Sequence, residues 1–501
     1  MKKFFPYKWA LFIFVLATVL RILFLDYLPQ RVDGDSSRFG LDGLKAWSEH
    51  WPFLGTGWYG HTNALMYVIG FFTKSFENEL FGLRLFSALG GVLGVVATYF
   101  LSKKMFGERV ALWSSLFLAI CPFHIVLSRI GTEVVWMSFF APISLFLILK
   151  TSWKHDLLAG VLIGVSQYLY PGARILPIMS CIFLGVLWLY KKKTLVETAK
   201  TGLIITAGLF LVYFPMARYF YFHQNEYFAR IDMVGIVQSG WLENEMRNKS
   251  FLQVIIPKII DNLKVFCLPV KTGAQFWFFR TPYLDALPAV FFIIGLSVSF
   301  IFIRKNFGFL FLVLFFLITV LFAGVLTVDS PTPSRYMIVF PVIAIFVGLG
   351  LEKTANILNG KRTAFLLFLL LVTSFVSYWK HEKVDTWRYD KNTQTATFTG
   401  RYLSKIKADY RVYFLSETSM YYDASPTLRF LTKRNGVNIF GSIEKEKGKI
   451  NFKENYVFLI LPSRVNELSL LKKINPGGFE KIIYNPRREI LAYLFSNINL
   501  Y

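Results

Sequence analysis

The sequence predicts an α-helical polytopic membrane protein with a small α/β domain after its last membrane span. Hydrophobic residues make up 54% of the 501 positions, and 53 of them are phenylalanine. The mean hydropathy of +0.47 is too high for a water-soluble enzyme. Apolar runs long enough to cross about 30 Å of hydrocarbon recur along the chain. After Tyr378 the composition changes to short apolar runs between polar turns.

About eleven apolar runs have the length of a membrane span. They cover roughly residues 9–28, 83–101, 110–127, 134–150, 157–170, 174–190, 201–219, 285–303, 309–327, 336–352 and 363–379. With a cytoplasmic N-terminus, every loop predicted to be cytoplasmic carries Lys or Arg, as the positive-inside rule requires. We therefore interpret the net charge of +24 as topology and contact with anionic lipid, and not as nucleic-acid binding. The first 28 residues are interpreted as a retained anchor, because no small-residue cleavage site follows them.

The loop after the first predicted span contains the main candidates for chemistry. Asp33 and Asp35 lie in RVDGDSSRFGLDGL, just beyond the outer end of that span. One interpretation is that they only cap the helix that follows, because Asp and Ser are favoured N-cap residues. Residues 40–51 and 63–76 have helical spacing but are too short to cross, so we expect interfacial helices that roof a cavity.

Four arginines fall at predicted outer ends of spans. A cation at that depth needs water, a carboxylate or a phosphate, because its cost in the bilayer centre is roughly 2.5–3.5 kcal/mol. Snorkelling to lipid headgroups would explain any one of them. Two of the four follow proline-containing turns that would aim a guanidinium at a fixed place, which favours phosphate binding. The four are Arg84 and Arg129, without such a turn, and Arg174 and Arg335, with one.

Several other reactions find no support in the sequence. The three cysteines have neither metal-ligand nor redox spacing. No P-loop, no GxGxxG after a strand and no HExxH occurs in a credible context, so neither a soluble nucleotide cofactor nor a zinc protease is indicated. We assign no metal ligand, although a divalent ion stays open. A donor that reaches an outer-face site through the membrane would itself be a lipid.

Four segments together resemble a known family. They are Asp35-Ser36-Ser37-Arg38-Phe39-Gly40-Leu41-Asp42, the stretch from Leu83 to Glu133, YLYPGARILP from Tyr168, and SPTPSRYMIVFP from Ser330. The resemblance is to polyprenyl-phosphate-sugar-dependent glycosyltransferases of the GT-C fold, in glycosyltransferase family 39, which groups protein-mannosyltransferases with aminoarabinose transferases. It covers roughly residues 1–190 and 325–350. Many members follow the catalytic Asp with Glu, whereas Ser36 stands there in this chain and a second acid, Asp33, comes two residues before Asp35.

The resemblance implies an inverting transfer of a sugar from a polyprenyl phosphate, with an Asp as general base. By register this Asp is Asp35, with Asp33 as runner-up. The implied donor and cavity residues are Arg84, Arg129, Glu133, Tyr170, Arg174 and Arg335. The implied partners are the bilayer, the lipid-linked sugar and an extracytoplasmic acceptor, which is a glycan, a lipid or a protein. The implied place is a prokaryotic inner membrane, with no nucleic acid involved and with sugar and acceptor unspecified.

The expected organisation is a transmembrane GT-C domain over residues 1–380 and an extracytoplasmic α/β domain over 381–501. In the second domain, ADYRVYFLS, NYVFLILP, EKIIYN and EILAYLF are predicted strands, and PTLRFLTKR and VNELSLLKKI predicted helices. Its expected role is acceptor binding or structural. The alternative function is a multi-span lipid or polysaccharide transporter or flippase without transferase activity. Such a protein should show paired half-repeats with broken helices, which the sequence does not.

Overall fold

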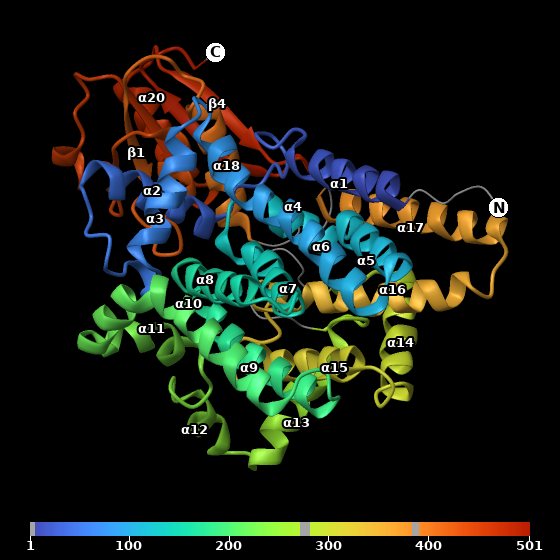
Figure 1. The fold of residues 1–501 in the computed structure, drawn as a ribbon. Helices are drawn as coiled ribbons and strands as arrows, with labels where there is room; N and C mark the ends of the chain where they lie inside the picture. Colours follow the sequence, from blue (N-terminus) through green and yellow to red (C-terminus); the bar gives the residue numbers. More distant parts are fainter. Residues whose placement is uncertain (1–5, 271–280, 383–389, 501) are drawn as a thin grey trace.

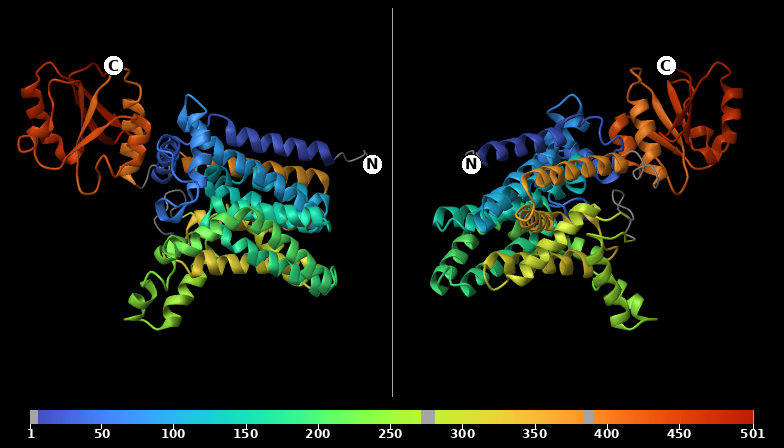
Figure 2. Two further views of the ribbon diagram at one scale, coloured as in Figure 1. Left: turned by 60° about the vertical axis from the view of Figure 1, so that its left-hand side comes forward. Right: turned by 90° about the vertical axis from the view of Figure 1, so that its right-hand side faces the viewer.

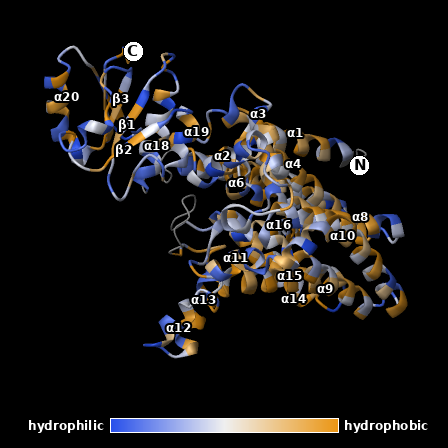
Figure 3. Cartoon of the chain, turned by 90° about the vertical axis from the view of Figure 1, so that its left-hand side faces the viewer, coloured by the Kyte–Doolittle hydropathy of each residue, from blue (hydrophilic) through white to orange (hydrophobic). Residues whose placement is uncertain are grey.

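The computed structural model describes residues 6–270, 281–382 and 390–500. They form a bundle of long helices and, at one end of it, a sheet domain built from the C-terminal residues (Figures 1 and 2). Hydrophobic residues dominate the bundle, whereas the sheet domain is largely hydrophilic outside its strands (Figure 3). Two segments of the predicted transmembrane domain lie outside the described residues. They are the N-terminal residues with Lys2 and Lys3, and residues 271–280 between the predicted spans 201–219 and 285–303.

Each predicted span coincides with one or more apolar helices of the bundle. The bundle helices are α1 (Pro6–Ile22), α4 (Glu79–Phe106), α5 (Glu108–Ile120), α6 (Pro122–Arg129), α7 (Met137–Ile148), α8 (Trp153–Leu169), α9 (Ile175–Leu189), α10 (Leu195–Phe222), α14 (Ala286–Ile301), α15 (Phe307–Thr319), α16 (Phe340–Ala355) and α17 (Gly360–Lys380). By length and composition, six helical stretches in the described residues can cross a membrane, or seven if the bent pair α5 and α6 forms one span. Residues 133–148 and 286–301 form shorter apolar helices, so the number eleven stays a prediction.

Two predicted spans differ from the helices that form. The predicted span 110–127 is broken into α5 and α6, which meet at 55°. Pro122 opens α6, and a proline has no N–H to continue the ladder of the preceding helix. The helix over the predicted span 9–28 is shorter than predicted. Helix α1 ends at Ile22, and the chain forms turns from there to about residue 32.

Glycines allow close packing between bundle helices. A Cβ added to Gly295 of α14 would lie 1.8 Å from the Phe346 carbonyl of α16, and one added to Gly160 of α8 would lie 2.1 Å from the Ile205 carbonyl of α10. Small residues at helix crossings let backbones approach, as is typical of membrane bundles, where packing rather than hydrophobic burial drives association. These crossings fix the helices whose ends carry the site described below.

Two short helices, α2 (Gly34–Ser48) and α3 (Asn63–Lys74), cover the end of the bundle beside the sheet domain. They cross with Gly43 against Gly70, where an added Cβ on Gly43 would lie 2.7 Å from the Gly70 nitrogen. The predicted short helix over 63–76 is thus confirmed. The one predicted over 40–51 starts earlier, because Asp33 caps it from outside.

A second group of short helices extends sideways from the bundle at the same end (Figure 2). These are α11 (Gln224–Val234), α12 (Trp241–Met246) and α13 (Phe251–Lys264). We refer to residues 224–264 as the lateral arm. The single-turn and irregular helices η1 (Trp58–Gly60), η2 (Glu133–Trp136), η3 (Pro171–Arg174), η4 (Val320–Val325) and η5 (Pro333–Val339) connect or extend the longer ones.

The sheet domain has five strands in the order β2-β1-β3-β5-β4. Strand β1 (Arg411–Leu415) pairs in parallel with β2 (Gly436–Ile439) and β3 (Tyr456–Ile460), whereas β5 (Ile490–Ser496) runs antiparallel to β3 and to β4 (Phe479–Tyr484). The predicted strands over β1, β3, β4 and β5 and the predicted helices α19 (Pro426–Thr432) and α20 (Leu468–Ile474) are confirmed. Helix α18 (Lys391–Leu403) and β2 were not predicted, because one is mostly polar and the other has four residues.

The sheet domain contacts the bundle through α19. The Phe430 ring lies so close to α2 that a Cβ added to Gly40 would meet it at 2.6 Å. Lys433, which follows α19, forms an ion pair with Glu79 at the start of α4, at 2.7 Å. The helix that begins at the two candidate acids is therefore packed between the bundle and the sheet domain.

The predicted topology can be tested with single cysteines in a Cys181→Ser, Cys267→Ser background. We expect a membrane-impermeant maleimide to label Lys445→Cys in right-side-out vesicles, and to label Ile357→Cys only after permeabilisation. Both positions are exposed, and one predicted span, residues 363–379, separates them, so they should lie on opposite sides of the membrane. The reverse labelling pattern would place the sheet domain in the cytoplasm.

Candidate active site

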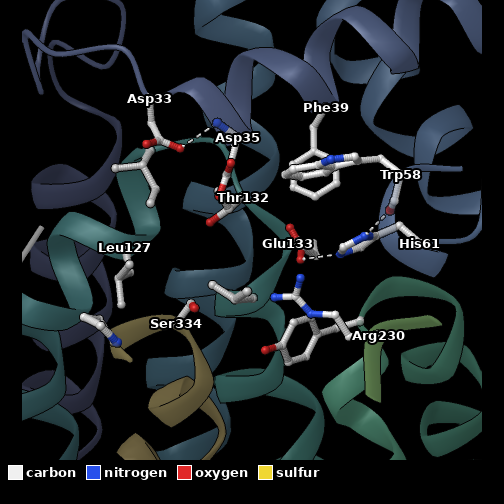
Figure 4. Close-up of a pocket in the computed structure, with 14 residues that line it drawn as sticks. Asp33, Asp35, Phe39, Trp58, His61, Leu127, Thr132, Glu133, Arg230 and Ser334 are labelled. Carbon is white, nitrogen blue, oxygen red and sulfur yellow. Dashed lines mark hydrogen bonds and ion pairs between the residues drawn. The ribbon is translucent and has the colours of Figure 1, made fainter. Parts of the chain in front are cut away.

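Both predicted acids line a cavity of about 70 Å³ at the end of the bundle beside the sheet domain (Figure 4). Its walls come from α2, η1, α6, η2, α11, η5 and the turn before η3. The lining residues are Asp33, Asp35, Phe39, Trp58, His61, Leu127, Ile130, Thr132, Glu133, Val134, Tyr170, Arg230, Pro333 and Ser334. Segments from residue 33 to residue 334 thus meet in one small, polar and partly enclosed space.

Asp33 is the N-cap of α2. Its Oδ2 accepts hydrogen bonds from the backbone amides of Asp35 at 3.1 Å and Ser36 at 3.2 Å. Its Oδ1 is buried and accepts no hydrogen bond from the described residues. Burial raises the pKa of Asp33, and the nearby Arg31 guanidinium opposes that rise. The capping interpretation therefore holds for Asp33, although only one of its two carboxylate oxygens takes part in the cap.

Asp35 lies in the first turn of α2, and its carboxylate points into the cavity beside Thr132 (Figure 4). Burial raises the pKa of Asp35 to about 7, and the negative charges of Asp33 and Glu133 act in the same direction. Arg230 acts in the opposite direction. A carboxyl group with this pKa exchanges its proton near neutral pH, which is what a general base requires.

His61 and Glu133 face each other across the cavity. His61 Nε2 lies 3.3 Å from Glu133 Oε1, and His61 Nδ1 lies 2.8 Å from the Trp58 carbonyl oxygen. A carbonyl oxygen only accepts, so Nδ1 carries a hydrogen. Trp58 stacks on the imidazole at an interplanar angle of 18°, and the second Glu133 oxygen has no hydrogen bond within the described chain.

Arg230 supplies the cavity with a positive charge that sequence analysis did not select. It comes from α11, and its guanidinium reaches toward Glu133 in Figure 4. The charges of Arg230 and Arg335 both act on the Tyr170 hydroxyl, so both arginines lie near it. Arg230 lies in the 220–284 region, where the family resemblance is poor, and no sequence signal distinguishes it from the exposed Arg247 of the same arm.

None of the four arginines singled out from the sequence lines the cavity. Arg84 donates to the carbonyls of Leu25, Pro29 and Arg31, and Arg129 donates to those of Leu20, Leu23, Phe24 and Leu28. Both side chains are almost fully buried. They satisfy the carbonyls that become free where α1 ends, which explains why a cation stands at this depth without a phosphate.

Arg174 and Arg335 lie nearer to the cavity. Arg174 stacks on the Tyr227 ring, 3.7 Å from its centroid, and donates to the Tyr227 carbonyl at 2.8 Å. It therefore holds α11 three residues before Arg230. Arg335 donates to Thr327 Oγ1 at 2.6 Å and to the Val328 carbonyl at 2.7 Å, directly after the cavity residues Pro333 and Ser334.

The segment that leads to the acids is fixed by the sheet domain. Arg31 is 1% exposed and forms an ion pair with Asp390 at 2.6 Å. The Gln30 amide donates to Glu382 at 2.7 Å, and the Val32 amide donates to Thr397 Oγ1 at 3.1 Å. In the described chain, no group of three or more His, Cys, Asp or Glu side chains is placed to hold a metal ion.

Comparisons with known proteins agree with the predicted resemblance. Residues 61–217 match the family model described as dolichyl-phosphate-mannose-protein mannosyltransferase. No curated protein sequence matches the chain.

Solved structures share the fold. The oligosaccharyltransferase of Archaeoglobus fulgidus in its apo form has a TM-score of 0.57 at 14% identity, over 98% of this chain and 74% of that one. The ArnT of Cupriavidus metallidurans bound to undecaprenyl phosphate has a TM-score of 0.56 at 13% identity, over 98% of both chains. The archaeal enzyme was also solved with an inhibitory peptide and a dolichol-phosphate, with a TM-score of 0.54 at 14% identity, over 98% of this chain and 74% of that one. The GT-C fold, and the resemblance to polyprenyl-phosphate-dependent glycosyltransferases, are thereby confirmed.

The Arg31–Asp390 pair should contribute strongly to stability. Arg31→Met would leave two carboxylates, Asp33 and Asp390, beside a buried apolar side chain, and breaking a buried ion pair in this way costs about 3–5 kcal/mol. Lys433→Met removes an exposed ion pair between the same two parts of the chain and should cost about 0.5 kcal/mol. Thermal unfolding in detergent compares them, and equal midpoints would contradict a strong contribution from Arg31.

Proposed function

We propose that this protein is a membrane glycosyltransferase that transfers a sugar from a polyprenyl phosphate to an extracytoplasmic acceptor with inversion of configuration. One observation carries the proposal: Asp35, a carboxylate whose pKa is raised to about 7, shares a small cavity with Arg230 and with His61 and Glu133, whose side chains are in contact. The shared fold and the family match over residues 61–217 support the same class of reaction.

The proposed reaction needs three groups around one sugar carbon. An acceptor hydroxyl or amine attacks the anomeric carbon and gives its proton to Asp35. The bond from that carbon to the phosphate oxygen breaks on the opposite side, which inverts the configuration. The leaving polyprenyl phosphate keeps the electron pair, so a cation beside it lowers the barrier. Asp35 can accept the proton only when it is ionised, which its pKa allows at neutral pH.

Arg230 and Arg335 are the proposed phosphate ligands. The charges of both act on the Tyr170 hydroxyl, and a planar guanidinium matches two phosphate oxygens in a way that an ammonium cannot. We assign Arg174 an indirect role, because its contacts go to Tyr227 of the helix that carries Arg230. Arg84 and Arg129 are left out of the donor site, because their guanidinium groups bind backbone carbonyls.

An apolar groove beside the cavity fits the lipid part of the proposed donor. It has a volume of about 730 Å³ and runs between α2, α3, α8 and α10. Its wall is almost entirely carbon, with aromatic side chains from Trp47, Phe53 and Tyr67. Tyr168 and Leu169 line the groove, and Tyr170 lines the cavity, so the two spaces are adjacent. A phosphate between Arg230 and Arg335 would place its polyprenyl chain near the groove.

Asn substitutions distinguish the two acids. Asp35→Asn should lower transfer at least about 100-fold, because it removes the base without a change of shape. Asp33→Asn should stay active, because Asn caps a helix as well as Asp does. It removes a negative charge that raises the pKa of Asp35, so the rise of kcat/KM with pH, centred near pH 7 in the wild type, should shift to lower pH.

The measurement is kcat/KM for transfer from pH 5 to 9, for the wild type and both variants. If Asp33→Asn abolishes transfer while Asp35→Asn keeps more than a tenth of it, the base is Asp33. If both variants keep wild-type rates and pH profiles, neither carboxylate takes the proton.

Arg→Lys substitutions test the phosphate site. Arg230→Lys and Arg335→Lys should each weaken use of the lipid donor by roughly 10-fold to 150-fold, since a charge-assisted hydrogen bond contributes about 1.5–3 kcal/mol. Arg247→Lys changes an exposed arginine of the same arm and serves as the control. KM and kcat for a short-chain polyprenyl-phosphate sugar report the effect. Unaltered constants in both cavity variants would mean that the donor phosphate binds elsewhere.

A further inference from the structure

Helix α13 of the lateral arm carries an exposed apolar row. The row consists of Leu252, Ile256, Ile259, Ile260 and Leu263, which are 38–63% exposed. Their spacing along the chain places them on one face of the helix. A row of this kind is usually turned toward a protein core, so its exposure requires an explanation.

Two polar side chains of α13, Lys258 and Asn262, face the protein. Lys258 Nζ donates to the Thr327 carbonyl at 2.9 Å and to Ser330 Oγ at 3.0 Å. The fully buried Asn262 donates to Ser330 Oγ at 3.2 Å and accepts from the Tyr336 hydroxyl. The inward face of the helix therefore carries two hydrogen-bonded polar side chains, whereas five aliphatic side chains point outward. Such an arrangement is favourable where the surroundings are hydrocarbon.

The position of α13 agrees with this. It leaves the bundle sideways, at the end where the sheet domain sits, and runs across the direction of the long helices (Figure 2). With 14 residues it is about 21 Å long, too short to cross a membrane. Basic residues stand at both ends, with Arg247 and Lys249 before it and Lys264 in its last turn, all of them exposed.

We propose that α13 lies flat in the membrane interface on the side of the sheet domain. The apolar row enters the acyl-chain region, and Arg247 and Lys264 contact anionic headgroups, whereas Lys249 pairs with Glu245 at 2.7 Å. The partner is thus the lipid surface, and this inference does not depend on the proposed transferase activity.

Anchoring of α13 would also hold the part of the arm that reaches the cavity. Thr327, which accepts the Lys258 hydrogen bond, bridges to Gly235 at the end of α11. The Val328 amide donates to the Val234 carbonyl at 2.8 Å, and the Ile236 amide donates to the Leu326 carbonyl at 3.2 Å. Arg230 stands one turn before Val234. The helix in the interface and the arginine of the cavity are therefore parts of one tied segment.

Site-directed fluorescence quenching tests the proposal on the full-length protein. Ile256→Cys and Ile260→Cys are made in the Cys181→Ser, Cys267→Ser background, labelled with an environment-sensitive fluorophore, and reconstituted into vesicles of phosphatidylcholine with phosphatidylglycerol. Asn248→Cys in the loop before α13 is the aqueous control. Native Cys181, exposed on α9 and kept as the single label site in a Cys267→Ser protein, is the reference for a span.

We expect nitroxides placed high on the lipid acyl chain to quench labels at positions 256 and 260 at least threefold more than a label at position 248. Iodide in the buffer should quench the label at position 248 more than the labels at positions 256 and 260. Quenching of positions 256 and 260 by iodide to the same extent as position 248 would show that the row faces water. Protection from both quenchers, with energy transfer between labels on different molecules, would show that a second copy covers it. Either result overturns the proposal. If Ile256→Cys or Ile260→Cys does not express, Ile259→Cys or Leu263→Cys on the same row takes its place.

Discussion

The site depends on how a short segment with several charges is kept buried after α1. From Pro29 to Asp33 the chain has left helical geometry, and its backbone groups need partners in an apolar environment. Arg84 takes the Pro29 and Arg31 carbonyls, and the sheet domain supplies Glu382 and Thr397 for two amides and Asp390 for the Arg31 guanidinium. The start of α2, and with it the direction of Asp35, is therefore determined jointly by the bundle and the sheet domain.

The cavity brings three carboxylates and two nitrogen bases together. Asp35 is buried beside Asp33 and Glu133, and the charges of both neighbours make its ionisation harder. Glu133 is matched by His61, and Arg230 adds a positive charge from the lateral arm. The charges lie close together and are largely buried, so they act on one another more strongly than they would in water. The same arrangement that costs stability gives one carboxylate a pKa near 7, which favours proton transfer.

The membrane explains features that would be unusual in a water-soluble protein. Arg129 and Arg84 are buried among backbone carbonyls at the end of α1, where the alternative would be a bare carbonyl in hydrocarbon. The apolar groove beside the cavity and the outward aliphatic row of α13 are both surfaces that need a lipid rather than water against them. The bundle and the lateral arm thus both present surfaces to lipid, and the lipid chain of the proposed donor would lie in the same environment.

Hydropathy and local patterns in the sequence determined the positions of the apolar helices, α3 and four of the five strands, and they singled out Asp33 and Asp35, which line the cavity. These features depend on neighbours along the chain, which a sequence displays directly. The sequence did not determine which arginines reach the cavity, because a proline-containing turn before Arg174 and Arg335 does not show what surrounds the guanidinium, and only the fold decides that. It also did not show that His61 meets Glu133, that Arg230 arrives from α11, or that Asp390 pairs with Arg31. Those contacts join residues 72 to 359 positions apart, and only tertiary packing brings them together.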